Sequence, residues 1–371
     1  MLTLSIRVGE RVMADGAFGL TKELERETAG VWAKVRDHVT PLEWPEQARL
    51  ISEINQLKRE RDAVILAHNY MTPEIFHGVG DYVGDSLGLA KEAARSDAKV
   101  IVQAGVHFMA ETSKILSPEK TVLIPDLRAG CSLASSITGA DVRLIKQRYP
   151  GLPVVTYVNT TADVKAETDI CCTSANAVQV VEWAAKEWGV DRVILIPDEY
   201  LARNVAAQTT VGIIAWKGRC EVHERFTADD IAEMRAAYPG AEILAHPECP
   251  EDVLAAADFA GSTAAMIDFV EAKKPRQVVM ITECSMASNV AGDVPGVQFI
   301  GPCNLCPHMK RITLENIRDC LAKMQFEVTV PEDMLERGRL AVQRMIDLPP
   351  PTVPARYDLI KARHHVAVEL I

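Results

Sequence analysis

The sequence lacks several features that would assign it to common classes of protein. It has no apolar run of about 18 residues or more, so no membrane-spanning helix is expected. Basic residues are in deficit, because 40 Lys and Arg stand against 51 Asp and Glu, and the net charge of −11 argues against a nucleic-acid partner. Residues 1–17 carry scattered charges and no apolar centre, so no secretory signal is expected there.

A disulfide framework is not indicated either. The nine cysteines are an odd number in an otherwise ordinary composition, with 25% charged residues. This favours a cytoplasmic protein with reduced thiols, some of which bind a metal. A hydrophobic content of 48% is sufficient for a buried core, and 371 residues predict two or three domains.

Three cysteines lie at nearly equal intervals along the chain. Cys131 and Cys220 are 89 residues apart (131 to 220), and Cys220 and Cys306 are 86 residues apart (220 to 306). Cys306 lies in a Gly- and Pro-containing segment, three residues after Cys303. The spacing predicts three repeated units, each of which contributes one thiolate to a shared centre.

The segments between these cysteines repeat one order of features. Each round has an apolar strand with a polar end, a Ser at a helix start, a second strand with a polar end, a third strand, and a cysteine. The expected strands are 62–67, 99–104 and 121–124, then 153–159, 192–196 and 211–216, then 241–245, 277–281 and 297–300. Alternating strands and helices predict parallel α/β units, whose ligands bind at the C-terminal ends of the strands.

We therefore predict an α/β protein of three similar units whose strand ends converge on one site. The predicted divisions are an N-terminal extension at 1–42, units at 43–143, 144–226 and 227–312, and C-terminal helices with a tail at 313–371. The tail, 352–371, is expected to pack on another element or on another subunit. The alternative is a single doubly wound sheet with incidental cysteines, but the recurrence of Cys, Ser and strand-end residues favours the repeat.

Three thiolates without an evident fourth ligand favour an iron–sulfur cluster with one open iron. Such an iron can bind water or a substrate oxygen as a Lewis acid. Zinc in a three-ligand catalytic site is the competing metal, although ligands that are all sulfur and far apart in sequence favour iron–sulfur.

Most of the other cysteines are not expected to bind metal. Cys171 and Cys172 precede a helix and are expected to pack, while Cys320 lies on an apolar helix face and is expected in the core. Cys249 and Cys284 follow strands and could line the site without binding metal. Cys303 could replace Cys306 as a ligand or form a redox pair with it.

Polar residues at the strand ends are the candidates for binding and catalysis. His68 and His246 occupy equivalent places in the repeat, and His223 follows Cys220 closely. Tyr70 and Glu248 are candidates for proton transfer, although Glu248 could instead be a surface charge. The Ser and Thr residues at helix starts could be N-caps, and the helix N-termini that they open could bind carboxylate or phosphate groups; they are Ser86, Ser174, Ser262 and Thr263.

Several of these motifs, in this order, resemble those of the quinolinate synthase (quinolinate synthetase A) family of de novo NAD biosynthesis. The resemblance covers about residues 50 to 320. The motifs are Ala67-His68-Asn69-Tyr70, Gly84-Asp85-Ser86-Leu87, Tyr157-Val158-Asn159-Thr160, Cys172-Thr173-Ser174-Ala175-Asn176, Ala245-His246-Pro247-Glu248-Cys249, Gly261-Ser262-Thr263 and Cys306-Pro307.

The resemblance implies three αβα domains in a pseudo-threefold arrangement around a 4Fe–4S cluster held by Cys131, Cys220 and Cys306. It implies condensation of iminoaspartate with dihydroxyacetone phosphate to quinolinate, with release of phosphate and water. Tyr70, His246 and Glu248 would be catalytic. The residues that would bind substrate are His68, Ser86, Tyr157, Asn159, Ser174, His223, His246, Glu248, Ser262 and Thr263.

Iminoaspartate hydrolyses readily, so transient contact with L-aspartate oxidase or aspartate dehydrogenase is expected. The chain departs from the family pattern in its long N-terminal extension and in Cys303, which could take part in a thiol–disulfide switch. Three alternatives to the synthase remain: a hydro-lyase with an open iron, a non-enzymatic iron–sulfur carrier or sensor, and a zinc-binding scaffold.

Overall fold

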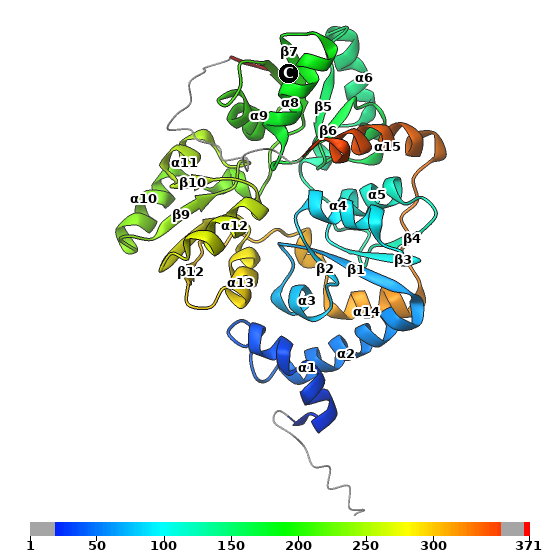
Figure 1. Ribbon diagram of the computed structural model, residues 1–371, viewed down its shortest axis with the longest axis vertical. Helices are drawn as coiled ribbons and strands as arrows, with labels where there is room; N and C mark the ends of the chain where they lie inside the picture. The colour runs from blue at the N-terminus through cyan, green and yellow to red at the C-terminus, as the bar shows by residue number, and fades with distance from the viewer. Residues whose placement is uncertain (1–18, 350–366) are drawn as a thin grey trace, which may run out of the picture.

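The computed structural model describes residues 19–349 and 367–371, which form three β-sheets in three lobes around a common centre (Figure 1). The first sheet has the order β2-β1-β3-β4, with β1 Ala63–His68, β2 Tyr82–Gly84, β3 Val100–Ala104 and β4 Thr121–Leu123. The second has the order β6-β5-β7-β8-β13, with β5 Val154–Tyr157, β6 Ile170–Cys172, β7 Arg192–Ile196, β8 Gly212–Ala215 and β13 Val368–Leu370. The third has the order β10-β9-β11-β12, with β9 Glu242–Ala245, β10 Phe259–Ala260, β11 Gln277–Ile281 and β12 Gln298–Ile300.

The three sheets share one topology. In each, the first strand of the round lies between the second and the third, and the fourth pairs with the third. All of these pairings are parallel. The predicted α/β class with three similar units is therefore confirmed.

Each round contains one strand that the sequence did not reveal. These strands, β2, β6 and β10, are only three, three and two residues long and lie beside the first strand of their round. So short a strand shows no alternation of apolar and polar residues, so the periodicity from which strands are predicted is absent.

Helices connect the strands of each unit. In the first unit they are α2 Trp44–Arg61, α3 Pro73–Gly78, α4 Ser86–Arg95 and α5 His107–Leu116. In the second they are α6 Gly139–Arg148, α7 Ala162–Ala166, α8 Ala177–Trp188 and α9 Glu199–Ala206. In the third they are α10 Ala228–Ala237, α11 Glu251–Ala256, α12 Thr263–Lys273 and α13 Cys284–Asp293.

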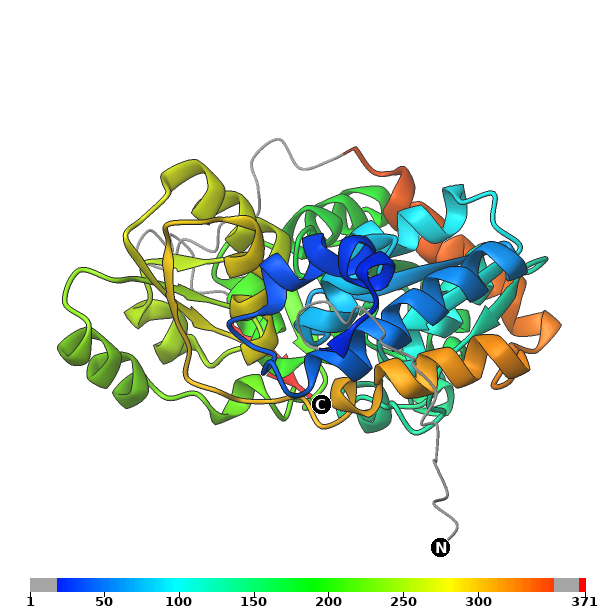
Figure 2. The same cartoon turned by 90° about the horizontal axis from the view of Figure 1, so that it is seen from below.

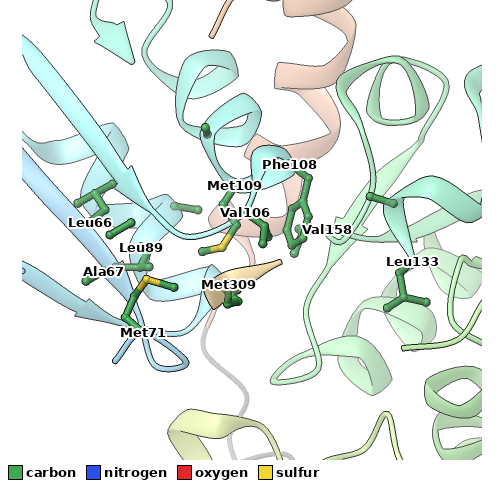
Figure 3. Close-up of a cluster of buried hydrophobic side chains, with 14 of the residues drawn as sticks. Leu66, Ala67, Met71, Leu89, Val106, Phe108, Met109, Leu133, Val158 and Met309 are labelled. Atoms are coloured by element: carbon green, nitrogen blue, oxygen red, sulfur yellow. The ribbon is translucent and has the colours of Figure 1, made fainter. Parts of the chain in front are cut away.

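One buried apolar cluster extends through all three units. It includes Ile65 of β1, Val155 of β5 and Ile243 of β9. Figure 3 shows part of it at the seam between the first two units, where Phe108 of α5 lies beside Val158, which follows β5. The units are thus joined by a continuous core and not only by their connecting segments.

The repeat extends beyond each of the three spaced cysteines. Each cysteine is followed by a 3-10 turn, at Ala134–Ser136, His223–Arg225 and Met309–Arg311. Seven residues after each cysteine a Thr begins a helix with a capping box, in which its side chain accepts from the backbone N–H three residues later and the side chain of that residue accepts from the Thr N–H. These residues are Thr138 before α6, Thr227 before α10 and Thr313 before α14, Leu314–Lys323.

Elements outside the three units cover the seams between them. Helix α14 packs against α2, and Figure 2 shows the two side by side. Helix α1, Lys22–Val35, packs on α2 and α3 of the first unit and on α13 of the third. Its Lys34 Nζ lies 2.7 Å from Asp293 Oδ1. Helix α15, Glu332–Asp347, packs on α5, α7 and β6 and so joins the first and second units.

The two predicted terminal segments are described in part. Helix α1 lies in the extension at 1–42, of which residues 1–18 lie outside the described residues. The end of the tail forms β13, where Val368 pairs with Ile213 of β8, while residues 352–366 also lie outside. Among the described helices, none combines the length and the apolar composition that crossing a bilayer requires.

The capping boxes give a test of the fold. Replacing Thr227 with Ala removes the oxygen that accepts from Asp230 N–H, so the free energy of unfolding should fall by about 1 kcal/mol. Thr227→Ser keeps this oxygen and should lose only a fraction of that. Chemical denaturation of both variants measures the difference, and equal losses would show that the cap does not stabilise α10.

Candidate active site

A single cavity lies where the strand ends of the three units converge. Its space, the open mouth included, is about 730 Å³. Tyr70 comes from the first unit, Tyr157 from the second and Glu248 from the third. No Lys or Arg is among the described residues that line it.

Most of the predicted site residues meet in this cavity. Those that line it are His68, Tyr70, Ser86, Cys131, Tyr157, Asn159, Ser174, Cys220, His223, His246, Glu248, Thr263 and Cys306. Ser262 is not among the lining residues, since its side chain caps α12 and accepts from Ala265 N–H at 3.3 Å. The assignment of roles to these residues stays a prediction.

The carboxylate of Glu248 forms contacts with several polar groups of the second unit. His223 Nδ1 lies 2.7 Å from Glu248 Oε2. The Tyr157 hydroxyl donates a hydrogen bond to Glu248 Oε1 at 2.5 Å, and Asn159 Nδ2 donates one to the same oxygen at 3.3 Å. Glu248 is only 3% exposed, so these contacts replace the water that an ionised carboxylate needs. Glu248 is therefore a buried group, and the alternative that it is a surface charge is wrong.

The histidines are ordered by one another and by hydroxyl groups. The rings of His223 and His246 stack with centroids 4.6 Å apart. His246 Nε2 lies 3.4 Å from Ser174 Oγ. Thr282 Oγ1 lies 2.9 Å from His223 Nε2 and 2.7 Å from the hydroxyl of Tyr70. Thr282 thereby connects Tyr70 to the group beside Glu248.

Burial and neighbouring groups set the protonation states. Burial opposes ionisation of Glu248, but His223, His246 and the Tyr157 hydroxyl outweigh it and hold the pKa of Glu248 below its usual range. Burial lowers the pKa of His68 to about 4 and that of His246 to about 3, although Glu248 opposes both shifts. Glu248 is therefore ionised near neutral pH, while His68 and His246 are neutral.

The two tyrosines that face the cavity remain protonated. Burial, followed by the charge of Glu248, raises the pKa of Tyr70 and that of Tyr157 well above the ordinary value. Both hydroxyl groups can therefore donate a hydrogen bond or a proton, but neither is an effective base in the absence of substrate.

Three helix N-termini lie at the cavity. Ser86 is the first residue of α4 and Thr263 the first of α12, while Ser174 lies three residues before α8 begins. These helices have 10, 11 and 12 residues, respectively. The free N–H groups and the partial positive charge of such N-termini attract anions.

The three equally spaced cysteines line the same cavity as free thiols. The 3-10 turn after each cysteine directs two backbone N–H groups at its sulfur, from the residues two and three positions later. Burial is the main cause that raises the pKa of Cys131, to about 12, and it also raises those of Cys220 and Cys306. Protonated thiols that meet in one cavity with N–H groups on their sulfurs suit a bound metal cluster, which would deprotonate them.

A second set of metal-ligating atoms overlaps the first. The ligand atoms of Cys220, His223 and Glu248 all lie within 4.8 Å of one another, and His223 Nδ1 is 3.2 Å from Cys220 Sγ. One sulfur, one nitrogen and one carboxylate oxygen could hold zinc. However, His223 and Glu248 already bind each other, which leaves the three-thiol set better suited to a metal.

The remaining cysteines lie apart from these thiols. Cys303 is paired with Cys284 in a disulfide, with Cα atoms 4.9 Å apart, and not with Cys306. Cys171 and Cys172 are buried in β6, where they pack. Cys320 is buried on α14, and Cys249 is buried with its sulfur 3.8 Å from the Ile281 carbonyl oxygen.

The sequence did not single out several residues of the cavity as site candidates. Phe108 and Val106 form part of its apolar wall, and Glu221, in the loop that follows Cys220, places its Oε1 2.8 Å from His308 Nε2. Adjacency to Cys220 could have revealed Glu221. No comparable signal marked the apolar residues, because they resemble ordinary core residues.

The chain is similar to known proteins over most of its length. Residues 52–347 match the family described as Quinolinate synthetase A protein. A quinolinate synthase of Caulobacter vibrioides is 79% identical over 95% of this chain and 96% of its own length. A quinolinate synthase of Sinorhizobium fredii is 58% identical over 94% and 95%, and one of Xylella fastidiosa is 64% identical over 80% and 86%. The chain therefore belongs to the quinolinate synthetase A protein family.

Proposed function

We propose that the chain is a quinolinate synthase of NAD biosynthesis. It condenses iminoaspartate with dihydroxyacetone phosphate and releases quinolinate, one phosphate and two waters, as a transferase-type condensing and dehydrating synthase. The observation that carries this proposal is the meeting of three free thiols and a buried, ionised carboxylate in one cavity. Relatives that are 58% to 79% identical over nearly the whole chain bear the same name.

The lining of the cavity supports the binding of two anionic substrates. Because residues 19–349 and 367–371 contribute no Lys or Arg to the lining, anions would be held by the N-termini of α4, α8 and α12 and by hydroxyl groups. Neutral His68 and His246 would serve as directed hydrogen-bond donors or acceptors. A site of this kind recognises carboxylate and phosphate oxygens without surrounding them with strongly hydrated cations.

The proposed cofactor is a 4Fe–4S cluster held by Cys131, Cys220 and Cys306. Three free thiols on one cavity, with two N–H groups directed at each sulfur, fit this group. When bound by three protein ligands, such a cluster would supply a Lewis-acidic iron toward a substrate oxygen.

Glu248 is proposed as the base of the reaction. Iminoaspartate must lose a proton from the carbon beside its imine to become an enamine, which then attacks the second substrate. Glu248 is ionised and buried, and its Oε1 is already oriented by Tyr157 and Asn159. Protonated Tyr70, linked through Thr282 to His223, would return a proton to an oxygen during isomerisation or dehydration.

Location and supply complete the proposal. The reaction would take place in the cytoplasm, and L-aspartate oxidase or aspartate dehydrogenase would supply the unstable iminoaspartate by transient contact.

Metal and product analysis tests the function directly. Protein purified without oxygen should contain about four irons and about four sulfides per chain, because three thiols hold this type of cluster. With both substrates it should form a pyridine dicarboxylate and phosphate in equal amounts. Added quinolinate should perturb the absorbance and paramagnetic-resonance spectra.

The outcomes separate the alternatives. Stoichiometric zinc without sulfide would exclude the cluster and point to the Cys220, His223 and Glu248 set. Iron and sulfide without any pyridine product would exclude the synthase and leave a hydro-lyase or a carrier.

A conservative substitution tests the proposed base. Glu248→Gln keeps the size and most hydrogen bonds of the side chain but removes its basicity, so kcat should fall by about 100-fold or more. Iron and sulfide contents should stay at the wild-type level. Glu242→Gln is the matched control. Glu242 lies on β9 and pairs with Lys273, so this substitution should leave kcat unchanged. A near-normal rate for Glu248→Gln would remove Glu248 from the mechanism.

The neutral histidines predict a dependence of stability on pH. The pKa of His246 is about 3 in the folded chain and near 6.5 when unfolded, so the unfolded chain binds more protons between these values. The resulting stability is present above pH 6.5 and is lost as the pH falls toward 3. When the pH is lowered from 7.5 to 5.5, the Tm of His246→Gln should therefore fall less than the Tm of the wild type. Calorimetry of both proteins measures the two decreases in Tm, and equal decreases would contradict the prediction.

A further inference from the structure

Asn204 of α9 binds the backbone on both sides of Glu248. Its Nδ2 donates to the carbonyl oxygen of Pro247 at 2.8 Å and to that of Cys249 at 3.1 Å. Asn204 belongs to the second unit, whereas Glu248 belongs to the third. One buried amide of the second unit therefore holds the backbone on both sides of the proposed base, at the carbonyl groups of the residue before it and of the residue after it.

Asn289 of α13 makes the same pair of contacts around Tyr70. Its Nδ2 donates to the carbonyl oxygen of Asn69 at 3.0 Å and to that of Met71 at 2.8 Å. Here the amide comes from the third unit, and the tyrosine from the first. The contact again crosses a seam and again flanks a proposed catalytic residue.

The two asparagines are equivalent in the repeat. Asn204 lies six residues after Asp198, the N-cap of α9, and Asn289 lies six residues after Glu283, the N-cap of α13. Tyr70 and Glu248 are equivalent as well, because each lies two residues before the N-cap of a short helix, Thr72 or Pro250. The same contact has thus been kept at two seams.

In the second unit a different side chain makes the equivalent contact, and it does so from within the unit and not across a seam. The position six residues after Val106, the N-cap of α5, is Thr112, whose hydroxyl donates to the Phe108 carbonyl at 2.7 Å. Lys165 of α7 takes over, and its Nζ donates to the carbonyl oxygens of Val158, at 2.8 Å, and Thr160. These carbonyl groups flank Asn159, the equivalent of Tyr70 and Glu248, and Lys165 is fully buried.

We propose that Asn204, Asn289 and Lys165 are positioning residues for the reaction and that they fix Glu248, Tyr70 and Asn159, respectively. The inference rests on the proposed function and deepens it. Holding the carbonyl groups of the preceding and the following residue restrains the backbone on both sides of the central residue, and thereby the direction of its Cα–Cβ bond. The site needs this precision because its groups join across units, as where Asn159 Nδ2 meets Glu248 Oε1 at 3.3 Å.

Packing alone does not account for the two asparagines. Within the described part of the chain, Oδ1 of Asn204 and Oδ1 of Asn289 are buried without a hydrogen-bond partner. A buried acceptor without a partner is unfavourable, and Leu would fill a similar volume without it. The donating half of each amide is what the positions require.

The test compares Asn204→Leu with a neighbouring control. The substitution removes both donors, so the segment from His246 to Pro250 loosens and Glu248 is misplaced. We expect kcat for quinolinate formation to fall by about 10- to 100-fold while KM changes by less than about threefold. Val205→Ala on the same helix leaves the loop contacts intact, because Val205 is buried among apolar residues. It should lose stability but keep its kcat.

Amide hydrogen exchange gives a second readout that does not depend on catalysis. The N–H of Cys249 donates to the His246 carbonyl at 2.9 Å, and the N–H of Glu248 to His246 Nδ1 at 3.3 Å, so both are protected in the folded chain. In Asn204→Leu, exchange should accelerate in the peptide spanning 246–250, but not in the equivalent peptide around Tyr70. Asn289→Leu should show the reverse pattern.

The outcomes distinguish the positioning role from the proposed function. A wild-type protein that makes no quinolinate would overturn the function, and hydrogen exchange would still decide the positioning role. Wild-type kcat and unchanged exchange in a folded Asn204→Leu protein would overturn the inference. If that variant does not fold, Asn204→Ser, whose short hydroxyl cannot reach both carbonyl groups, takes its place under the same criteria.

Discussion

The buried carboxylate of Glu248 is the group on which the rest of the site depends. A charge without water is tolerated only where partners replace the lost hydration. Its partners His223, Tyr157 and Asn159 come from the second unit, whereas Glu248 itself comes from the third. Neither unit alone could hold this charge, so the proposed active site exists only when the units are docked.

Docking therefore has to be stable, and much of the chain outside the sheets serves it. Each repeat is about 85 to 90 residues long, as the cysteine intervals show, and a unit of that size buries a modest apolar core by itself. The shared cluster that includes Ile65, Val155 and Ile243 compensates for this. Helices α1 and α15 then cover two seams, and α14 extends the chain from the third unit back onto α2 of the first.

The sequence was sufficient to predict the repeat and most of the residues around the cavity. The cysteine intervals and the polar ends of apolar runs are local patterns, and topology brings such strand ends together in parallel units. Strands β2, β6 and β10 escaped prediction because two or three residues show no period. The pairing of Cys284 with Cys303 escaped because it depends on how the loop after β12 folds back toward α13.

Some features that were not predicted can nonetheless be found by comparing the three repeats. The capping threonines Thr138, Thr227 and Thr313 stand at one fixed distance from the three cysteines, so an alignment of the rounds against one another would have found them. The same alignment pairs Asn204 with Asn289, but it gives Thr112 as the third member. The alignment cannot show that Lys165 of another helix replaces the missing amide, because only the hydrogen bonds of the folded chain reveal this replacement.

This replacement indicates how a threefold scaffold can serve an asymmetric reaction. Tyr70, Asn159 and Glu248 occupy one repeated position but offer a phenol, an amide and a carboxylate to the same cavity. Substrates without threefold symmetry require such different groups, whereas the backbone that carries them can remain repeated. We therefore expect the repeat to be kept in the carbonyl contacts and capping helices, and to be lost in the side chains that face the cavity. Lys165 is an example. The carbonyl groups that it binds are equivalent to those that Asn204 and Asn289 bind, although a lysine replaces the asparagine.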